Sequence, residues 1–378
     1  MFRKSKIYKY LAFTFIISSV FGITIYCLLS NRHKAIVKTQ LLYTIGLVDT
    51  EWSIQTKKQA YKMVSPTFLI DGIYKSMEGP KSSRYIQLSQ KDSLLWITGF
   101  EVQALDAQTN DTISKDFICH MNVDINDVNY YTQWGLEERI GKQYPRLTSL
   151  SNGFEKYSYP DGYGIPIKGT DYLFITSQAL NHNYKSLFKK IKHEISITHE
   201  RYDGSQKPLM SKTVFIQLPY DKFNPYKGPL SSGSNQCIPV ETKNHSYMDK
   251  DGNMLSGHWV IPKGKNSYRS AISAQLDLKD SLRLHFAAIH VHPLATSIAL
   301  VDKTTHEILF KSLIINYTGK IGLQKVTPFS SQEGLWLYAD HEYELVLEVN
   351  NTSEMDQDMM GSMFLFFYDR ELDEKIKK

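Results

Sequence analysis

The stretch Leu284–Pro293 reads LHFAAIHVHP, an apolar run that ends in two histidines separated by one residue. Alternate side chains of a β-strand share a face, so His290 and His292 are expected to point the same way and to reach one metal ion. A third ligand is available in Asp358–Tyr368, where a methionine pair that includes Met360 opens another apolar strand. Two imidazoles and a thioether suit copper, whereas magnesium and calcium prefer oxygen ligands. The alternative is that the two histidines are half-buried and hydrogen-bonded without a metal.

The rest of the chain has the same β-rich character. Short apolar or alternating runs recur at short intervals, as in Leu94–Val102, Phe117–Asp124 and Tyr172–Leu180, and clusters of Gly, Pro, Asn and Asp separate them. Many short strands with turn residues between them predict an antiparallel sandwich. No long amphipathic helix is evident in this part of the sequence, so we expect an all-β fold.

At 378 residues the chain exceeds the usual size of one domain, which predicts two sandwich domains. A basic polar stretch near residues 185–192 lies between two strand-like runs and favours a change of domain there. We place the first sandwich at residues 66–188 and the second, with the copper ligands, at residues 189–372. Residues 31–65 are expected to form a polar stalk with some helical character, and residues 219–239 a long surface loop.

Residues 11–30 (LAFTFIISSVFGITIYCLLS) contain no charged residue. At helical rise such a segment spans about 30 Å, the thickness of a bilayer's hydrocarbon core, and therefore predicts a single transmembrane anchor. The competing interpretation is a cleaved signal peptide, but no small-residue cleavage site follows the segment. Because basic residues crowd the first nine positions, we expect residues 1–10 to be cytoplasmic and the body to be extracytoplasmic.

The net charge of +5 comes from the N-terminal region. Seven of the 44 Lys and Arg residues lie in the first forty positions, where there is no acidic residue, and removing them leaves 37 basic against 39 acidic residues. Phosphate binding needs basic residues clustered on the folded part of a protein. The near-neutral body therefore argues against a nucleic acid as a partner.

Several segments of the chain resemble, in order, the copper type II, ascorbate-dependent monooxygenases, the family of peptidylglycine α-hydroxylating and dopamine β-monooxygenases. The resemblance covers roughly residues 66–370. It is carried by Trp96–Glu101 with Cys119–Met121, by Thr176–Asn183, by His258–Gly264, by His290–His292, and by Met360 with the aromatic strand that follows.

The resemblance implies two jelly-roll-like antiparallel β-sandwich domains behind the N-terminal transmembrane helix, with one copper in each domain and a water-filled cleft between them. It implies that the copper on His290, His292 and Met360 binds dioxygen beside the substrate C–H bond. The copper of the first domain, which His120 and His182 would hold, stores and delivers an electron.

The chain departs from the family pattern at the first copper site. Cys119 precedes His120 where the family has two adjacent histidines, and Leu180 stands at the position of the third histidine. His182, two residues further on, shares a strand face with that position and can replace it. Cys119 points away from His120 in a regular strand and is expected in the core, unless a β-bulge turns it. Water or His258 are the other candidates for a third ligand.

These patterns predict a copper-dependent monooxygenase-like protein that hydroxylates a C–H bond of a small molecule or peptide with O2 and an external reductant such as ascorbate. Ala288 and Phe364 stand where peptide-amidating members have arginine and tyrosine, which argues against peptidylglycine as the substrate. Two alternatives stay open. One is a membrane-tethered copper-binding protein without hydroxylase activity, and the other is a metal-free sandwich that binds a partner.

Overall fold

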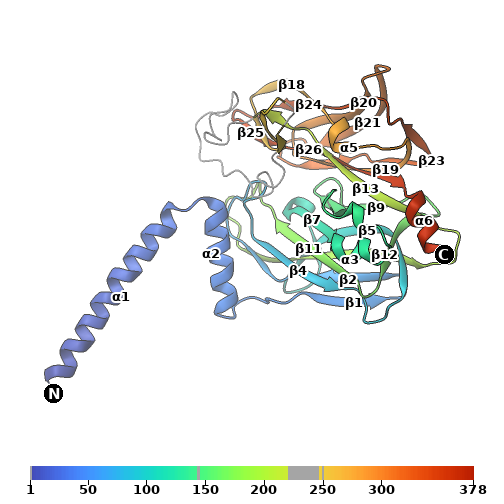
Figure 1. The fold of residues 1–378 in the computed structure, drawn as a ribbon. Helices are drawn as coiled ribbons and strands as arrows, with labels where there is room; N and C mark the ends of the chain where they lie inside the picture. Colours follow the sequence, from blue (N-terminus) through green and yellow to red (C-terminus); the bar gives the residue numbers. More distant parts are fainter. Residues whose placement is uncertain (1, 143–144, 220–246, 249–250) are drawn as a thin grey trace.

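The computed structural model describes residues 2–142, 145–219, 247–248 and 251–378. Antiparallel strands dominate these residues and form two sandwiches, and an apolar helix extends away from them at the N-terminus (Figure 1). The all-β fold predicted from the sequence is thereby confirmed. The surface loop predicted at residues 219–239 lies, from residue 220 onward, outside the described residues.

Two helices begin the chain, α1 (Phe2–Leu28) and α2 (Asn31–Thr44). Within α1, Tyr10–Leu28 is long and apolar enough to cross a membrane, and none of its residues is buried among the described parts of the protein. The chain turns at Ser30, whose hydroxyl accepts a hydrogen bond from the backbone N–H of His33 and so caps α2. The helix α2 then packs on the body, where Lys38 Nζ lies 2.5 Å from Asp71 Oδ2.

The first sandwich has a long sheet and a four-stranded sheet, and the inner faces of both contribute to one hydrophobic core. The strands of the long sheet that belong here are, in spatial order, β1 (Ser53–Lys57), β2 (Ala60–Val64), β12 (Lys189–Arg201), β5 (Leu94–Asp106) and β10 (Tyr163–Lys168), with β3 (Phe68–Ile70), β6 (Thr112–Ile113) and β9 (Lys156–Ser158) at their sides. The four-stranded sheet is ordered β4 (Lys81–Gln87), β11 (Tyr172–Ala179), β7 (Ile118–Ile125) and β8 (Arg146–Ser151).

The pairing of two strands bears on the expected domain limits. The strand β12 pairs with β2 and β5 along most of its length, so a division at residues 188 and 189 would separate it from its hydrogen-bonding partners. The hairpin of β1 and β2, which lies within the expected stalk, likewise belongs to this sheet. Strand pairing therefore favours a domain change between β12 and β13, and a stalk that is no longer than α2 and the turn after it.

The second sandwich packs four strands that continue the long sheet against a five-stranded sheet. The first group is β13 (Lys207–Phe215), β26 (Gly361–Tyr368), β19 (Leu282–Val291) and β23 (Phe329–Leu337). The second is β18 (Gly264–Ala271), β24 (Tyr343–Asn351), β20 (Ala295–Asp302), β21 (Glu307–Asn316) and β22 (Leu323–Val326). Small sheets pair β17 (Trp259–Ile261) with β25 (Gln357–Met359), and β16 (Met254–Ser256) with β14 (Leu218–Pro219) and β15 (Tyr247–Met248).

The two sandwiches are packed against each other at their junction. A short parallel pairing of β10 with β13 continues the long sheet from one sandwich to the other. The ring of Tyr157 stacks on Phe286 with centroids 4.8 Å apart, and the backbone N–H of Val326 donates a hydrogen bond of 2.8 Å to the carbonyl of Gly153. Lys320 Nζ lies 2.5 Å from the buried carboxylate of Asp116. These contacts join the two sandwiches directly at several points of the junction.

Candidate metal centre

The C-terminal end of β19 presents two histidines at the domain junction. The alternation of this strand sends Ile289 and Val291 into the core, and His290 and His292 to the opposite face. Their ring centroids are 5.8 Å apart, and both rings border one small cavity. His292 is almost fully buried, whereas His290 is half-buried.

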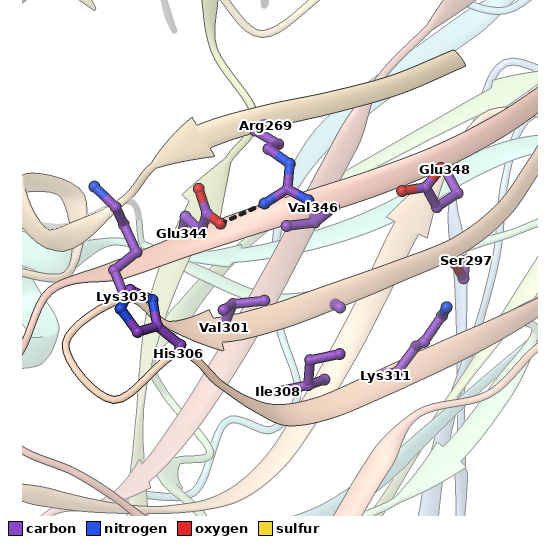
Figure 2. Close-up of a pocket in the computed structure, with 11 residues that line it drawn as sticks. Arg269, Ser297, Val301, Lys303, His306, Ile308, Lys311, Glu344, Val346 and Glu348 are labelled. Carbon is purple, nitrogen blue, oxygen red and sulfur yellow. Dashed lines mark hydrogen bonds and ion pairs between the residues drawn. The ribbon is translucent and has the colours of Figure 1, made fainter. Parts of the chain in front are cut away.

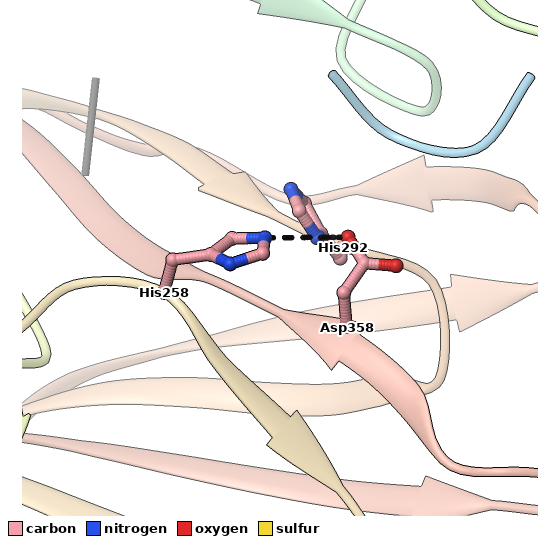
Figure 3. A group of neighbouring side chains, drawn as sticks. All are labelled: His258, His292 and Asp358. Atoms are coloured by element: carbon pink, nitrogen blue, oxygen red, sulfur yellow. Dashed lines mark ion pairs between the residues drawn. The ribbon is translucent and has the colours of Figure 1, made fainter. Parts of the chain in front are cut away.

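Two further groups reach His292 from the small sheet of β17 and β25. His258 precedes β17, and Asp358 lies in β25 opposite Val260, so pairing of these short strands places both side chains beside the end of β19. Asp358 Oδ2 lies 2.9 Å from His292 Nδ1 and 3.4 Å from His258 Nε2 (Figure 3). One ligand atom from each residue lies within 4.8 Å of the other two.

The polar atoms of this group are buried and have no hydrogen-bond partner outside the group. Apart from their short contacts with one another, His258 Nε2, His292 Nδ1 and Asp358 Oδ2 have no partner among the residues that the structure describes. Buried polar groups in proteins are nearly always hydrogen-bonded or bound to an ion. The three atoms therefore have the environment of ligands that share one cation.

The electrostatics of the group favour an ionised carboxylate at Asp358. Burial would raise the pKa of Asp358, but His292 and His258 oppose it and hold that pKa well below its usual range. Burial lowers the pKa of His290 well below its usual value, and His292 and His120 act in the same direction. A carboxylate and neutral imidazole nitrogens are the protonation states that metal coordination requires.

The first sandwich contributes His120 and His182 to the same place. His120 is buried in β7 and borders the cavity that His290 and His292 also border. His182 follows β11, and burial lowers its pKa to about 4. The negative charge of Asp358 raises this pKa, whereas His292 lowers it further. The two histidine sets that the family resemblance assigns to separate coppers thus meet at one junction.

Met360, the expected thioether ligand, lies half-buried between β25 and β26. Its neighbour Met359 is fully buried in the core, and Asp358 is the residue of β25 that reaches His292. Asp358 was not predicted as a ligand, although it lies only two residues before Met360 in the sequence. His258 was predicted only as a substitute ligand for the first site.

A second hollow lies on the outer face of the five-stranded sheet, away from these histidines (Figure 2). It has a volume of about 400 Å³ and an apolar floor that includes Val301 and Val346. Two of its charged groups form an ion pair, with Arg269 Nη1 2.9 Å from Glu344 Oε1. Among the residues described, this hollow does not combine histidine, cysteine and carboxylate ligand atoms as the junction does.

Comparisons with known proteins do not assign this chain to a family. No protein-family model matches the sequence, and no curated protein matches it. Among solved structures, PNGase F from Flavobacterium meningosepticum, described as a glycosylasparaginase, is 8% identical, with a TM-score of 0.34 over 80% of this chain and 96% of its own. The cowpea mosaic virus top component is 9% identical, with a TM-score of 0.31 over 80% and 90% of the two chains. Similarities at this level carry no argument about function.

Proposed function

We propose that this chain is a membrane-anchored copper protein whose metal is held at the junction of its two sandwiches by His258, His292 and Asp358. One observation carries the proposal. Ligand atoms from three separate segments converge within 4.8 Å of one another, and in the described part of the chain they have no hydrogen-bond partner outside this group. Burying an ionised carboxylate is costly unless a cation or several hydrogen bonds compensate it.

The donor set fits a transition metal better than other cations. Imidazole nitrogen suits copper, zinc, iron and nickel, whereas calcium and magnesium bind chiefly through several oxygen atoms. Among divalent first-row metals, copper binds most tightly to such a site. His290, at the edge of the same group, offers a further imidazole. This donor chemistry supports the proposal of copper, held by His258, His292 and Asp358 in place of the set His290, His292 and Met360 that the sequence predicted.

The test is metal binding by the full-length protein in detergent. We expect about one tightly bound Cu(II) per chain, and more than about a 100-fold loss of affinity in both His258→Ala and Asp358→Asn, because each removes a direct ligand. His306→Ala and Asp280→Asn remove exposed residues of the same types and serve as matched controls. Copper affinity that is unchanged in Asp358→Asn would contradict the proposed centre.

Hydroxylation of a C–H bond is the second candidate function. It is favoured by the small number of direct ligands, since three protein ligands leave positions open for O2 and substrate. A redox-active copper would supply electron transfer to O2, while His258, His292 and Asp358 would hold the metal and His290 would border the reaction space. The test is ascorbate-driven oxygen consumption by the copper-loaded protein. We expect slow consumption with some peroxide formation, lost in His292→Ala. Equal rates for this variant and the wild type would exclude catalysis at the centre.

A further inference from the structure

We propose a second, softer metal position in the cavity beside this centre, formed by the Cys119 thiolate, the Met77 thioether and the His120 imidazole, and suited to Cu(I). The proposal rests on the proposed function in one respect, namely that the junction of the two sandwiches binds metal. It adds a different ligand chemistry, a different oxidation state and a different set of residues.

A β-bulge in β7 brings Cys119 into the cavity. His120 pairs with Gln178 of β11, but the next residue of β11, Ala179, pairs with Ile118, so Cys119 is the extra residue in β7. A regular strand would send Cys119 and His120 to opposite faces, whereas a bulge changes the direction of the side chain. Both residues border the same cavity as His290 and His292.

Met77 reaches the same cavity from the segment before β4. Its side chain is buried in a small apolar cluster with Cys119 and Leu180. Its backbone has φ 66°, a left-handed conformation that residues other than glycine rarely adopt. Two residues later, Gly79 lies so close to β11 that an added Cβ would be 2.0 Å from the Ala179 carbonyl oxygen. This close contact with β11 fixes the segment that carries Met77.

The cavity has room for one ion. Its volume is about 20 Å³, and roughly 10–15 Å³ is needed to hold one water molecule. His290 Nδ1 is buried at its wall without a hydrogen-bond partner in the described residues, and the nearly fully buried His292 also borders it. This buried nitrogen of His290, beside two sulfur-containing side chains, indicates a bound cation rather than an apolar void.

The ligand types decide which cation fits. Thiolate and thioether are soft donors that select Cu(I), and a compact site of two sulfur atoms and one nitrogen suits a single ion of low charge. Cys119 must lose its thiol proton to bind, so uptake of Cu(I) releases a proton. The neighbouring set of two imidazoles and a carboxylate is harder and prefers the divalent ion. The junction thus offers adjacent positions for the two oxidation states of copper.

The experiment is an anaerobic Cu(I) titration of the full-length protein in detergent against a chromophoric Cu(I) chelator. A background with Cys27→Ser and Cys237→Ser leaves Cys119 as the only thiol of the chain. We expect Cys119→Ser to weaken Cu(I) binding by about 100-fold or more, and Met77→Leu by about 10-fold. Met355→Leu removes an exposed methionine and is the matched control.

The outcomes separate this proposal from the previous one. If Cys119→Ser loses Cu(I) but keeps Cu(II), and Asp358→Asn does the reverse, both positions exist. If only Cys119→Ser weakens copper binding, the soft position stands and the proposed centre fails. If only Asp358→Asn weakens it, the proposed centre stands and the soft position is excluded. Copper X-ray absorption of the unmutated, Cu(I)-loaded protein needs no variant. Sulfur scattering supports the proposal, and a copper environment of nitrogen and oxygen alone overturns it.

Discussion

Buried histidines in this protein fall into two kinds, which their hydrogen bonds distinguish. His193 is fully buried, with Nδ1 2.7 Å from Ser177 Oγ and Nε2 3.1 Å from the carbonyl oxygen of Phe117. The ring therefore donates through Nε2 and accepts through Nδ1, which fixes a neutral tautomer. His258 and His292, in contrast, each have a ring nitrogen without a hydrogen-bond partner among the described residues. The first kind stabilises the fold, and the second is available to a metal.

His193 should make the stability of the fold depend on pH. Burial lowers its pKa from 6.5 to about 4, so between these values the unfolded chain binds a proton that the folded chain does not. The stabilisation is complete above pH 6.5 and is lost as the pH falls through 4, by about 3 kcal/mol for this one group. Urea unfolding at pH 7 and pH 4.5 measures it.

The variant His193→Gln isolates this contribution from that of the other buried histidines. It should be less stable than the wild type at pH 7 but lose less stability on acidification. His306→Gln, at an exposed position, should follow the wild type at both pH values. A pH dependence in His193→Gln as steep as that of the wild type would show that folding does not lower the pKa of His193.

Among the strands, regular alternation could be predicted from the sequence, but its interruptions could not. The apolar pattern of residues 284–293 correctly predicted a strand with His290 and His292 on one face, because that pattern depends only on neighbouring residues. The bulge at Cys119 depends on how β7 pairs with β11, and the position of His258 depends on pairing of β17 with β25, about one hundred residues later. Such pairings between distant segments leave no local pattern.

The short C-terminal helix α6 (Arg370–Ile376) connects the second sandwich to the first. Asp369, which caps this helix, accepts hydrogen bonds from Arg139 at 2.5 Å and 3.1 Å, and Glu371 accepts another from Arg139 at 2.6 Å. Only 3% of the Asp369 side chain is exposed. Because the two ends of this interaction belong to different sandwiches, it should help to hold the junction together.

Arg139→Ala should therefore destabilise the protein strongly. The change leaves Asp369 buried without its main ionic partner, and breaking a buried pair in this way costs about 3–5 kcal/mol. Arg370→Ala provides the comparison, because its i,i+4 pair with Glu374 is exposed and is worth about 0.3–0.5 kcal/mol. The midpoint of urea unfolding measures both. Equal effects of the two substitutions would show that the Arg139 contact adds no stability to the junction.

In the whole molecule, the candidate centre and the apolar helix α1 lie at the same end. Glu78 follows Met77, and its carboxylate hydrogen-bonds to Asn31 at the start of α2. The same carboxylate lies close enough to Asp358 for their negative charges to repel each other. Burial raises the pKa of Glu78, and Asp358 acts in the same direction. The helix α2 is in turn joined to the body by Lys38 and Asp71. A copper ion bound at the junction would thus lie close to the anchor, rather than at the far end of the sandwiches.

This arrangement leads to a prediction about the mature protein in its membrane. The segment Tyr10–Leu28 has the length and composition of a membrane span, and its exposed apolar side chains need lipid around them. The full chain should therefore sediment with membranes and resist carbonate extraction, while a variant without residues 2–30 should lose this attachment. A protease added on the extracytoplasmic side should cleave the sandwiches of the wild type. A soluble mature form that begins near residue 31 would show instead that α1 is a cleaved signal sequence.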